Sequence, residues 1–170
     1  PNVIDITGEL VERFGEELVE NIAYTFAGSA GGLYLKDNSP SAVQKMMEAV
    51  REVPHVLGVW WKEDPEAPWF VKRIAHPRTF DLLIIPERDW VIVDPGVKEG
   101  NVMAHHGPPF PPDLNVVQIF CGPGIKRMGL LGNPLDMESR KLMTETEVEG
   151  LPEQRDVARL MLNLFGLSED

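Results

Sequence analysis

The sequence contains only one cysteine, Cys121, so no disulfide can form within the chain. A disulfide-stapled secreted scaffold is therefore excluded, and we expect a cytoplasmic location in a reducing compartment. The chain also lacks any apolar run close to the ~20 residues that a membrane-spanning helix needs, so no membrane partner is expected.

Basic residues are scarce as well. Lys and Arg total 16 against 27 Asp and Glu, which gives a formal net charge of -11. An acidic chain repels the phosphate backbone of nucleic acids, and no basic stripe with interleaved aromatic residues is present. Binding to a nucleic acid backbone is therefore not expected.

The residues that are present suit a globular protein. The chain has 170 residues, of which 43% are hydrophobic, and this is enough for one packed domain with at most a small appendage. The first residue is Pro1 rather than methionine. We therefore expect a processed product or a piece of a longer protein.

Residues 1–31 are predicted to form an N-terminal helical segment. Thr7 can cap a helix over residues 8–14, and residues 16–22 continue the amphipathic pattern. The stretch 28–32 is rich in glycine but lacks the spaced glycines and the lysine of a phosphate-binding loop. A turn that leads into a strand is therefore favoured here.

Residues 32–94 are predicted to form a compact α+β subdomain. A strand over residues 32–36 is followed by a helix that starts at Ser39-Pro40. Apolar residues in this helix recur with helical spacing and are expected to pack on a sheet: Val43, Met46, Met47 and Val50.

Three further strands are predicted over residues 56–62, 80–85 and 90–93, the last two joined as a hairpin. The order strand, helix, strand, strand, strand indicates a small, mostly antiparallel sheet with a packed helix, which is an α+β fold. Trp60 and Trp61 are adjacent in a strand, so their side chains should face opposite ways.

Residues 95–170 form a C-terminal segment of different character. Residues 95–115 are loop-like and rich in glycine and proline, and residues 116–120 are a continuous apolar run typical of a strand buried on both faces. The last helix is expected over residues 153–165. One face of this helix is apolar: Val157, Leu160, Met161 and Leu164.

Four histidines are candidates for chemistry. His55 and His76 adjoin prolines and are expected at the surface, whereas His105 and His106 lie in the loop before the buried strand. Neighbouring side chains in an extended segment point apart, so the pair should not bind one ion together. A catalytic zinc takes about three protein ligands, and Asp94 and Asp113 do not stand at ligand spacing. Local sequence therefore leaves open whether these are loop histidines without a ligand role.

Nucleophile motifs are missing from the sequence. There is no Gly-x-Ser-x-Gly elbow, no Walker motif and no Cys-His pair in a suitable context. Cys121 follows the apolar run and is expected to be buried and inert. Arg78 and Asp81 are expected to form an ion pair or a turn cap rather than to act in catalysis.

Two motifs, Ala104-His105-His106-Gly107 and Val116-Val117-Gln118-Ile119-Phe120-Cys121-Gly122-Pro123-Gly124-Ile125-Lys126, resemble the end of the alkaline phosphatase superfamily. Its type I phosphodiesterase/nucleotide pyrophosphatase group has a His-Gly pair, a hydrophobic strand and a Gly-Pro-Gly-like turn with a basic residue. Upstream, Leu33-Tyr34-Leu35, Gly58-Val59-Trp60 and Arg78-Thr79-Phe80-Asp81-Leu82 resemble the small α+β insertion before the last metal histidine.

This resemblance implies two divalent metal ions, usually zinc, and a Thr or Ser nucleophile that forms a covalent phospho-enzyme. His106, directly before Gly107, matches the last metal histidine of the family, and His105 stands at a variable position. The nucleophile and the other metal ligands of the family lie N-terminal to anything in this chain. The parent would be an α/β enzyme that ends in the C-terminal strand and helix of an alkaline phosphatase-like fold.

We therefore expect a C-terminal fragment of a metal-dependent phosphoric ester hydrolase. Its partner would be the missing N-terminal catalytic portion, and its substrate a small phosphate ester. The chain alone should bind no cofactor, supply no catalytic residue and be inactive.

Two departures from the family pattern stand beside this expectation. The loop 108–112 is unusually rich in proline, and residues 154–158 replace the usual Asp-x-x-Pro-Thr start of the last helix. Two alternatives remain open, namely a relative of metal-dependent phosphoglycerate mutases and a stand-alone α+β interaction or regulatory domain without metal.

Overall fold

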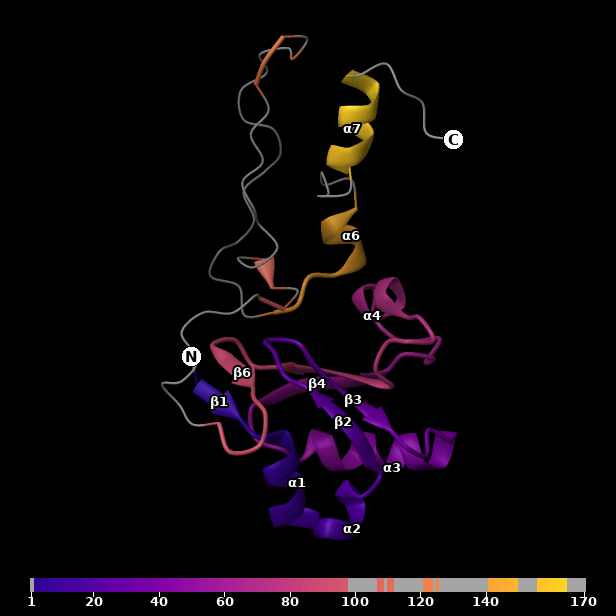
Figure 1. The fold of residues 1–170 in the computed structure, drawn as a ribbon, viewed down its shortest axis with the longest axis vertical. Helices are drawn as coiled ribbons and strands as arrows, with labels where there is room; N and C mark the ends of the chain where they lie inside the picture. Colours follow the sequence, from indigo (N-terminus) through magenta and orange to yellow (C-terminus); the bar gives the residue numbers. More distant parts are fainter. Residues whose placement is uncertain are drawn as a thin grey trace.

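The computed structural model describes residues 2–97, 107–108, 110–111, 121–123, 125, 141–149 and 156–164. These residues form helices, a four-stranded sheet and a two-stranded sheet (Figure 1). The expected α+β class is thereby confirmed. Within the same residues, no helix is both long enough and apolar enough to cross a membrane.

The four-stranded sheet has the order β2-β3-β5-β4 and is antiparallel throughout. Its strands are β2 (Ile22–Phe26), β3 (Gly31–Leu35), β5 (Leu82–Pro86) and β4 (Val56–Trp61). Strands β3 and β4 run parallel to each other with β5 between them, which is a split β-α-β arrangement. All five residues of β5 are buried, so this central strand carries the near-continuous apolar sequence expected of a strand covered on both faces.

Helix α3 (Pro40–Arg51) covers one face of this sheet. Pro40 stands in its first turn, where the missing amide hydrogen costs nothing. Each of the four side chains predicted to face the sheet is 6% exposed or less: Val43, Met46, Met47 and Val50. The predicted packing is confirmed, and burial of each such side chain contributes about 1.5–3 kcal/mol.

Helices α1 (Ile6–Phe14) and α2 (Glu16–Val19) lie on the same side of the sheet as α3 (Figure 1). The predicted cap of α1 was wrong by two residues. Asp5, not Thr7, is the N-cap, and its Oδ1 accepts a hydrogen bond from the Gly8 amide at 2.8 Å. Aspartate is among the strongest capping residues because its carboxylate also complements the positive end of the helix.

The helical prediction for residues 16–22 was also wrong in part. Helix α2 ends at Val19, and Ile22 begins the edge strand β2. A further strand, β1 (Asn2–Ile4), precedes α1. The N-terminal segment is therefore only partly helical, because the β-branched and aromatic residues of β2 pair with β3.

Strand β6 (Trp90–Ile92) corrects the predicted hairpin. It pairs with β1 in parallel, with Val3 opposite Val91, and forms an antiparallel bridge to Gly28 through Ile92. A hairpin between β5 and β6 is not possible here, since both edges of β5 are already paired with β3 and β4.

Helix α4 (Trp69–Ile74), which the sequence reading missed, covers the face of the sheet opposite α3. Phe70 of this helix packs edge-on against Trp60, with ring centroids 5.3 Å apart at 88°. Trp61 packs instead with the core on the α3 side. The prediction that the two tryptophans face opposite ways is confirmed.

The C-terminal segment is described only in parts, and the predicted strand over residues 116–120 lies outside them. Helix α6 (Glu145–Val148) follows Thr144, and helix α7 (Asp156–Leu164) lies within the helix predicted over residues 153–165. On α7, Val157 and Leu160 are half-buried and Met161 is 42% exposed. The division of the chain at residues 31 and 94 stays a prediction.

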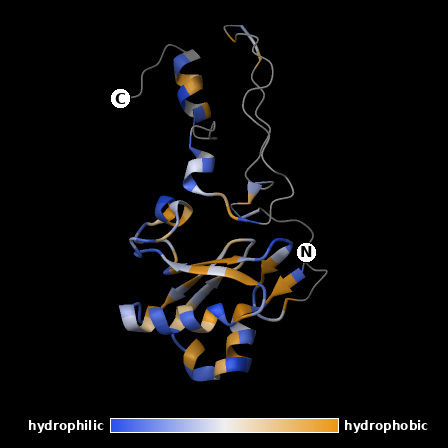
Figure 2. Ribbon diagram, turned by 180° about the vertical axis from the view of Figure 1, so that it is seen from behind, coloured by the Kyte–Doolittle hydropathy of each residue, from blue (hydrophilic) through white to orange (hydrophobic). Residues whose placement is uncertain are grey.

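Hydropathy follows this layering. In Figure 2 the central strands are the most hydrophobic part of the ribbon, and the helices beneath them mix both colours as amphipathic helices do.

The segment before α6 reaches the α4 side of the sheet, where Trp69 Nε1 donates to the Met143 carbonyl at 2.7 Å and Leu142 contacts the α4 core.

Candidate functional site

His105 and His106 lie outside the residues that the structure describes, so the assignment of His106 as a metal ligand stays a prediction. The structure does describe the start, up to residue 97, of the segment that the sequence predicts to be their loop. Strand β6 delivers the chain to Asp94 and Pro95, which are exposed and pass close to α1 and β2.

Asp5 fixes the start of this loop. Its Oδ1 caps α1 through the Gly8 amide, and its Oδ2 accepts a hydrogen bond from the Gly96 amide at 3.3 Å. Gly96 has a φ of 82°, a conformation that glycine adopts without steric strain. One carboxylate therefore joins the beginning of α1 to the beginning of the loop.

A shallow, open cavity of about 290 Å³ lies beside this point. The hydroxyls of Thr7 and Thr25 meet in it at 3.2 Å. Asp94 is the one charged residue among those that line it: Thr7, Val19, Ile22, Ala23, Tyr24, Thr25, Asp94 and Pro95. A single carboxylate with two hydroxyls is too small a ligand set for a divalent cation. In the part of the chain that the structure describes, no three His, Cys, Asp or Glu side chains gather as a metal site.

His55 and His76 both lie at the surface, as the sequence predicts. His55 Nδ1 lies 3.0 Å from Glu87 Oε2, and its ring stacks on Trp90. His76 Nδ1 accepts a hydrogen bond from the Arg78 amide at 3.1 Å. Both rings therefore make contacts within turns, and neither belongs to a group of three metal-binding side chains among the described residues.

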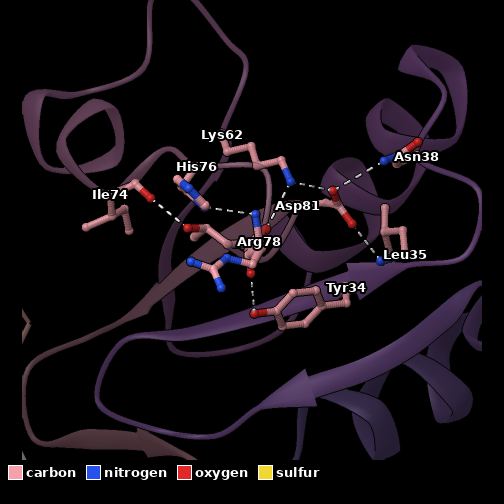
Figure 3. A network of polar contacts seen from close by, with 9 residues as sticks. Tyr34, Leu35, Asn38, Lys62, Ile74, His76, Arg78 and Asp81 are labelled. Atoms are coloured by element: carbon pink, nitrogen blue, oxygen red, sulfur yellow. Dashed lines mark hydrogen bonds and ion pairs between the residues drawn. The ribbon is translucent and has the colours of Figure 1, made fainter.

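Asp81 is the most buried charged residue in the part of the chain that the structure describes, and it pairs with Lys62 rather than with Arg78 (Figure 3). Lys62 Nζ lies 3.1 Å from Asp81 Oδ1, and Asp81 Oδ2 accepts the Leu35 amide at 2.8 Å. Both charged side chains are 10% exposed or less. The ion pair ties the ends of β3, β4 and β5 together, and the expected Arg78–Asp81 pair is wrong.

Cys121 is exposed, not buried as expected. The residue follows the predicted strand, but Gly122 turns the chain sharply with a φ of 140°. The turn places the Cys121 side chain at the surface, where it takes no part in apolar packing.

Four aromatic rings form a continuous layer over β2 and β3, which we call the aromatic platform: Tyr24, Phe26, Tyr34 and Phe80. Tyr24 and Tyr34 are paired across the strands, with ring centroids 6.1 Å apart. Phe80 lies 6.2 Å from the rings of both Tyr34 and Phe26. Its ring rests on Gly32, where a Cβ would overlap it.

The platform remains accessible, since Tyr24 is 60% exposed and Phe26 is 46% exposed. Sequence reasoning missed it because the predicted amphipathic stretch stopped at residue 22 and no strand was predicted over β2. The alternation of Tyr24 and Phe26 about Thr25 was the available signal, because residues i and i+2 of a strand share a face.

A scan against protein-family models and a search of curated proteins each found no match to this chain.

Proposed function

We propose that this chain is the C-terminal portion of a metal-dependent phosphoryl hydrolase that resembles the type I phosphodiesterase/nucleotide pyrophosphatase group. The observation that carries the proposal is the order of its motifs. A compact α+β unit comes first, a His-Gly pair in a glycine- and proline-rich loop follows, and an apolar run with a Gly-Pro-Gly turn ends the series.

The pairing of β1 with β6 supports this proposal. The two strands are parallel, and the four-stranded sheet with α3 and α4 lies between them in the sequence. Sheets made only of parallel strands occur almost only in α/β proteins, where both of their faces are covered. A parallel pair that brackets an α+β unit fits an insertion into the α/β sheet of a larger enzyme.

In this proposal His106 supplies one metal ligand, and the remaining ligands and the Thr or Ser nucleophile come from the N-terminal catalytic portion. The two divalent ions, zinc in most such enzymes, would activate the nucleophile and stabilise charge on the phosphoryl oxygens. The contribution of Asp5 is to position the loop, because its carboxylate holds Gly96 at the N-terminus of α1.

The proposal also covers partner and location. The direct partner is the N-terminal catalytic portion of the same protein, and the substrate is a small phosphate ester. A single cysteine supports a reducing compartment, and we propose the cytoplasm.

The test compares this chain with its intact parent. The purified 170-residue chain should hydrolyse neither p-nitrophenyl phosphate nor a p-nitrophenyl phosphodiester, and it should retain little zinc. The parent should hydrolyse these esters and should retain zinc. Robust turnover by this chain would overturn the fragment assignment. A mock preparation, purified in the same way from cells that do not express the chain, should show no activity and so excludes a contaminating phosphatase. A phosphoglycerate mutase activity in the parent would assign it to that relative of the same superfamily.

A stand-alone interaction domain is the second candidate function. The observation that favours it is the self-contained core of the α+β unit together with an open aromatic face. The parent reading frame separates the two proposals, since an upstream Asp-His-Gly motif and a Thr or Ser nucleophile support the hydrolase, and a receptor or transcription-factor neighbour supports the interaction domain.

A further inference from the structure

Three rings of the aromatic platform, those of Tyr24, Phe26 and Tyr34, belong to neither hydrophobic core of the sheet, whereas Phe80 packs against the core on the α4 side. The α3 side of the sheet contains the main core, and α4 covers the other face only above β4 and β5. Tyr24 and Phe26 project from the edge strand β2 on this second face, beyond the reach of α4, and keep about half of their surfaces exposed. Exposed aromatic side chains that gather in one place usually mark a binding surface.

The charges around the platform are arranged unevenly. From Asn21 to Leu35, the stretch that supplies β2 and β3, the sequence contains no charged residue. The segment that supplies Phe80 is basic instead, with no acidic residue between Glu66 and Asp81 but with three cationic residues and one histidine: Lys72, Arg73, Arg78 and His76. In a chain with a net charge of -11, this is a local excess of positive charge.

Arg78 brings that charge to the platform. Its carbonyl oxygen accepts a hydrogen bond from the Tyr34 hydroxyl at 3.2 Å, and Phe80 lies two residues further on. The Arg78 side chain is exposed, and Figure 3 draws it at the hydroxyl end of Tyr34. The nearest acidic side chain in the sequence, Asp81, is already neutralised by Lys62.

We propose that the platform binds a small aromatic phosphate ester, such as a nucleoside monophosphate or an aryl phosphate. The planar group stacks on Tyr24 and Phe26, and the phosphate binds the guanidinium of Arg78. Stacking on aromatic side chains tolerates any planar ring, whereas a guanidinium selects a phosphate by charge and by its paired N–H donors.

A small ligand fits this surface better than the alternatives. A single-stranded nucleic acid would carry many phosphates across a protein of net charge -11, and the repulsion would act along its whole length. A small ligand meets only the local field, because salt screens charges beyond about 10 Å. A purely apolar peptide would make no use of Arg78.

The biological role of this site rests on the proposed function, because a phosphoryl hydrolase would meet such esters as substrates or products. The site itself is built from β2, β3 and the segment before β5, and none of these was assigned a ligand role by the sequence resemblance. Binding can therefore be measured on this chain without metal and without hydrolysis.

Tyrosine signals in an NMR titration give the direct test. Both tyrosines of the chain, Tyr24 and Tyr34, belong to the platform. In a sample with 13C-labelled tyrosine rings, adenosine monophosphate and phenyl phosphate should shift both signals saturably, with a Kd of about 1 mM or below. Adenosine and inorganic phosphate should each bind about tenfold more weakly, since each lacks one half of the interaction.

Two variants test which residues bind the planar ring and which bind the phosphate. Tyr24→Ala and Arg78→Ala should each weaken binding of adenosine monophosphate at least about fivefold. Both side chains are exposed, so the fold should persist. The matched controls are Phe14→Ala, a 44% exposed aromatic on α1, and Lys45→Ala, an exposed cation on α3, and both should leave binding unchanged.

Three results would overturn the proposal. These are the absence of any saturable shift, an equal loss of binding in the control variants, and tighter binding of a single-stranded oligonucleotide than of the mononucleotide. Platform binding by this chain combined with an intact parent that hydrolyses nothing would overturn the proposed function alone. Hydrolysis by the parent with no binding at the platform would overturn this inference alone.

Discussion

The imidazole ring of His55 lies flat on the indole of Trp90, with ring centroids 3.7 Å apart and 10° between the planes. His55 precedes β4 of the four-stranded sheet, and Trp90 begins β6 of the parallel pair. The contact thus connects the two sheets, and Glu87 strengthens it through its carboxylate and through its amide, which donates to the His55 carbonyl at 2.8 Å. His55 holds a φ of 64° to make this contact.

The first prediction concerns this strained histidine. His55→Gly should lower the free energy of unfolding by on the order of 1 kcal/mol through loss of the stack. His55→Ala should lower it further, by up to about 1 kcal/mol more, because a Cβ at positive φ is strained. Urea denaturation of the three proteins measures both differences. An alanine variant as stable as the glycine variant would show that the backbone leaves this conformation once the ring is removed.

The second prediction concerns the ion pair of Lys62 and Asp81. Asp81→Asn keeps an acceptor for the Leu35 amide but leaves the buried Lys62 ammonium without a counter-charge. This should destabilise the fold by about 3–5 kcal/mol. Adding Lys62→Met to that variant should recover part of the loss, because no charge is then buried. Equal stability of the single and double variants would mean that Lys62 reaches solvent when its partner is lost.

The third prediction concerns the core under α3. Met46 is 1% exposed, and Met46→Ala should lower the free energy of unfolding by about 2–5 kcal/mol, since the vacated space cannot collapse completely. Lys45→Ala, one residue earlier on the exposed side of the same helix, should change it by less than about 0.5 kcal/mol. Chemical denaturation checks the pair, and similar values for the two variants would contradict the packing of α3 on the sheet.

The fourth prediction concerns pH. The backbone amide and then the hydroxyl of Ser39 hold the pKa of Asp37 below its ordinary value of 3.8. A carboxyl whose pKa is lowered by folding stabilises the protein above its unfolded pKa, and this contribution disappears as pH falls through the folded pKa. The stability difference between the protein and Asp37→Ala should therefore be constant from neutral pH to about pH 5 and shrink below about pH 4. Denaturation curves across this range measure it, and a difference that grows on acidification would reverse the assigned sign.

The fifth prediction concerns the metal histidine in the intact parent. His106→Ala should lose bound metal and at least about 10- to 100-fold in activity, which is the typical loss for a supporting group around a metal. His105→Ala should keep most of both, because adjacent side chains in an extended segment diverge. Metal analysis by mass spectrometry and phosphodiester hydrolysis measure the two variants. If the intact enzyme with His106→Ala keeps its metal content and its activity, neither histidine of the pair is a metal ligand.

The sequence predicted those elements whose formation depends on residues close together in the chain. The pattern of Val43, Met46, Met47 and Val50 and the start at Pro40 lie within a dozen residues, so α3 and its buried face could be predicted. Helix α4 could not, because its six residues, Trp69–Ile74, are too few to show a helical repeat of apolar side chains. The partner of β6 depends on β5 being paired on both edges, which is a property of the assembled sheet.

The candidate sites divide in the same way. Neighbouring residues predict a loop position for His106, and both this position and its ligand role stay predictions because residues 98–106 lie outside the described part of the chain. The aromatic platform combines Tyr24, Tyr34 and Phe80, which the sequence separates widely and only the strand pairing unites. Lys62 and Asp81 were not matched for a similar reason, since the register of β4 against β5 decides which cation the carboxylate meets.

The position of β5 has a consequence for synthesis on the ribosome. A nascent chain that has emerged through residue 81 contains β3 and β4, but the strand that joins them has not yet been made. At about 5–20 residues per second, two apolar strand edges stay open for several seconds while the intervening chain is translated. The four-stranded sheet can therefore form only late, when Leu82–Pro86 pairs with β3 and β4, which were synthesised before it. The growing polypeptide is thus most open to aggregation, and most in need of a chaperone, just before its central strand emerges.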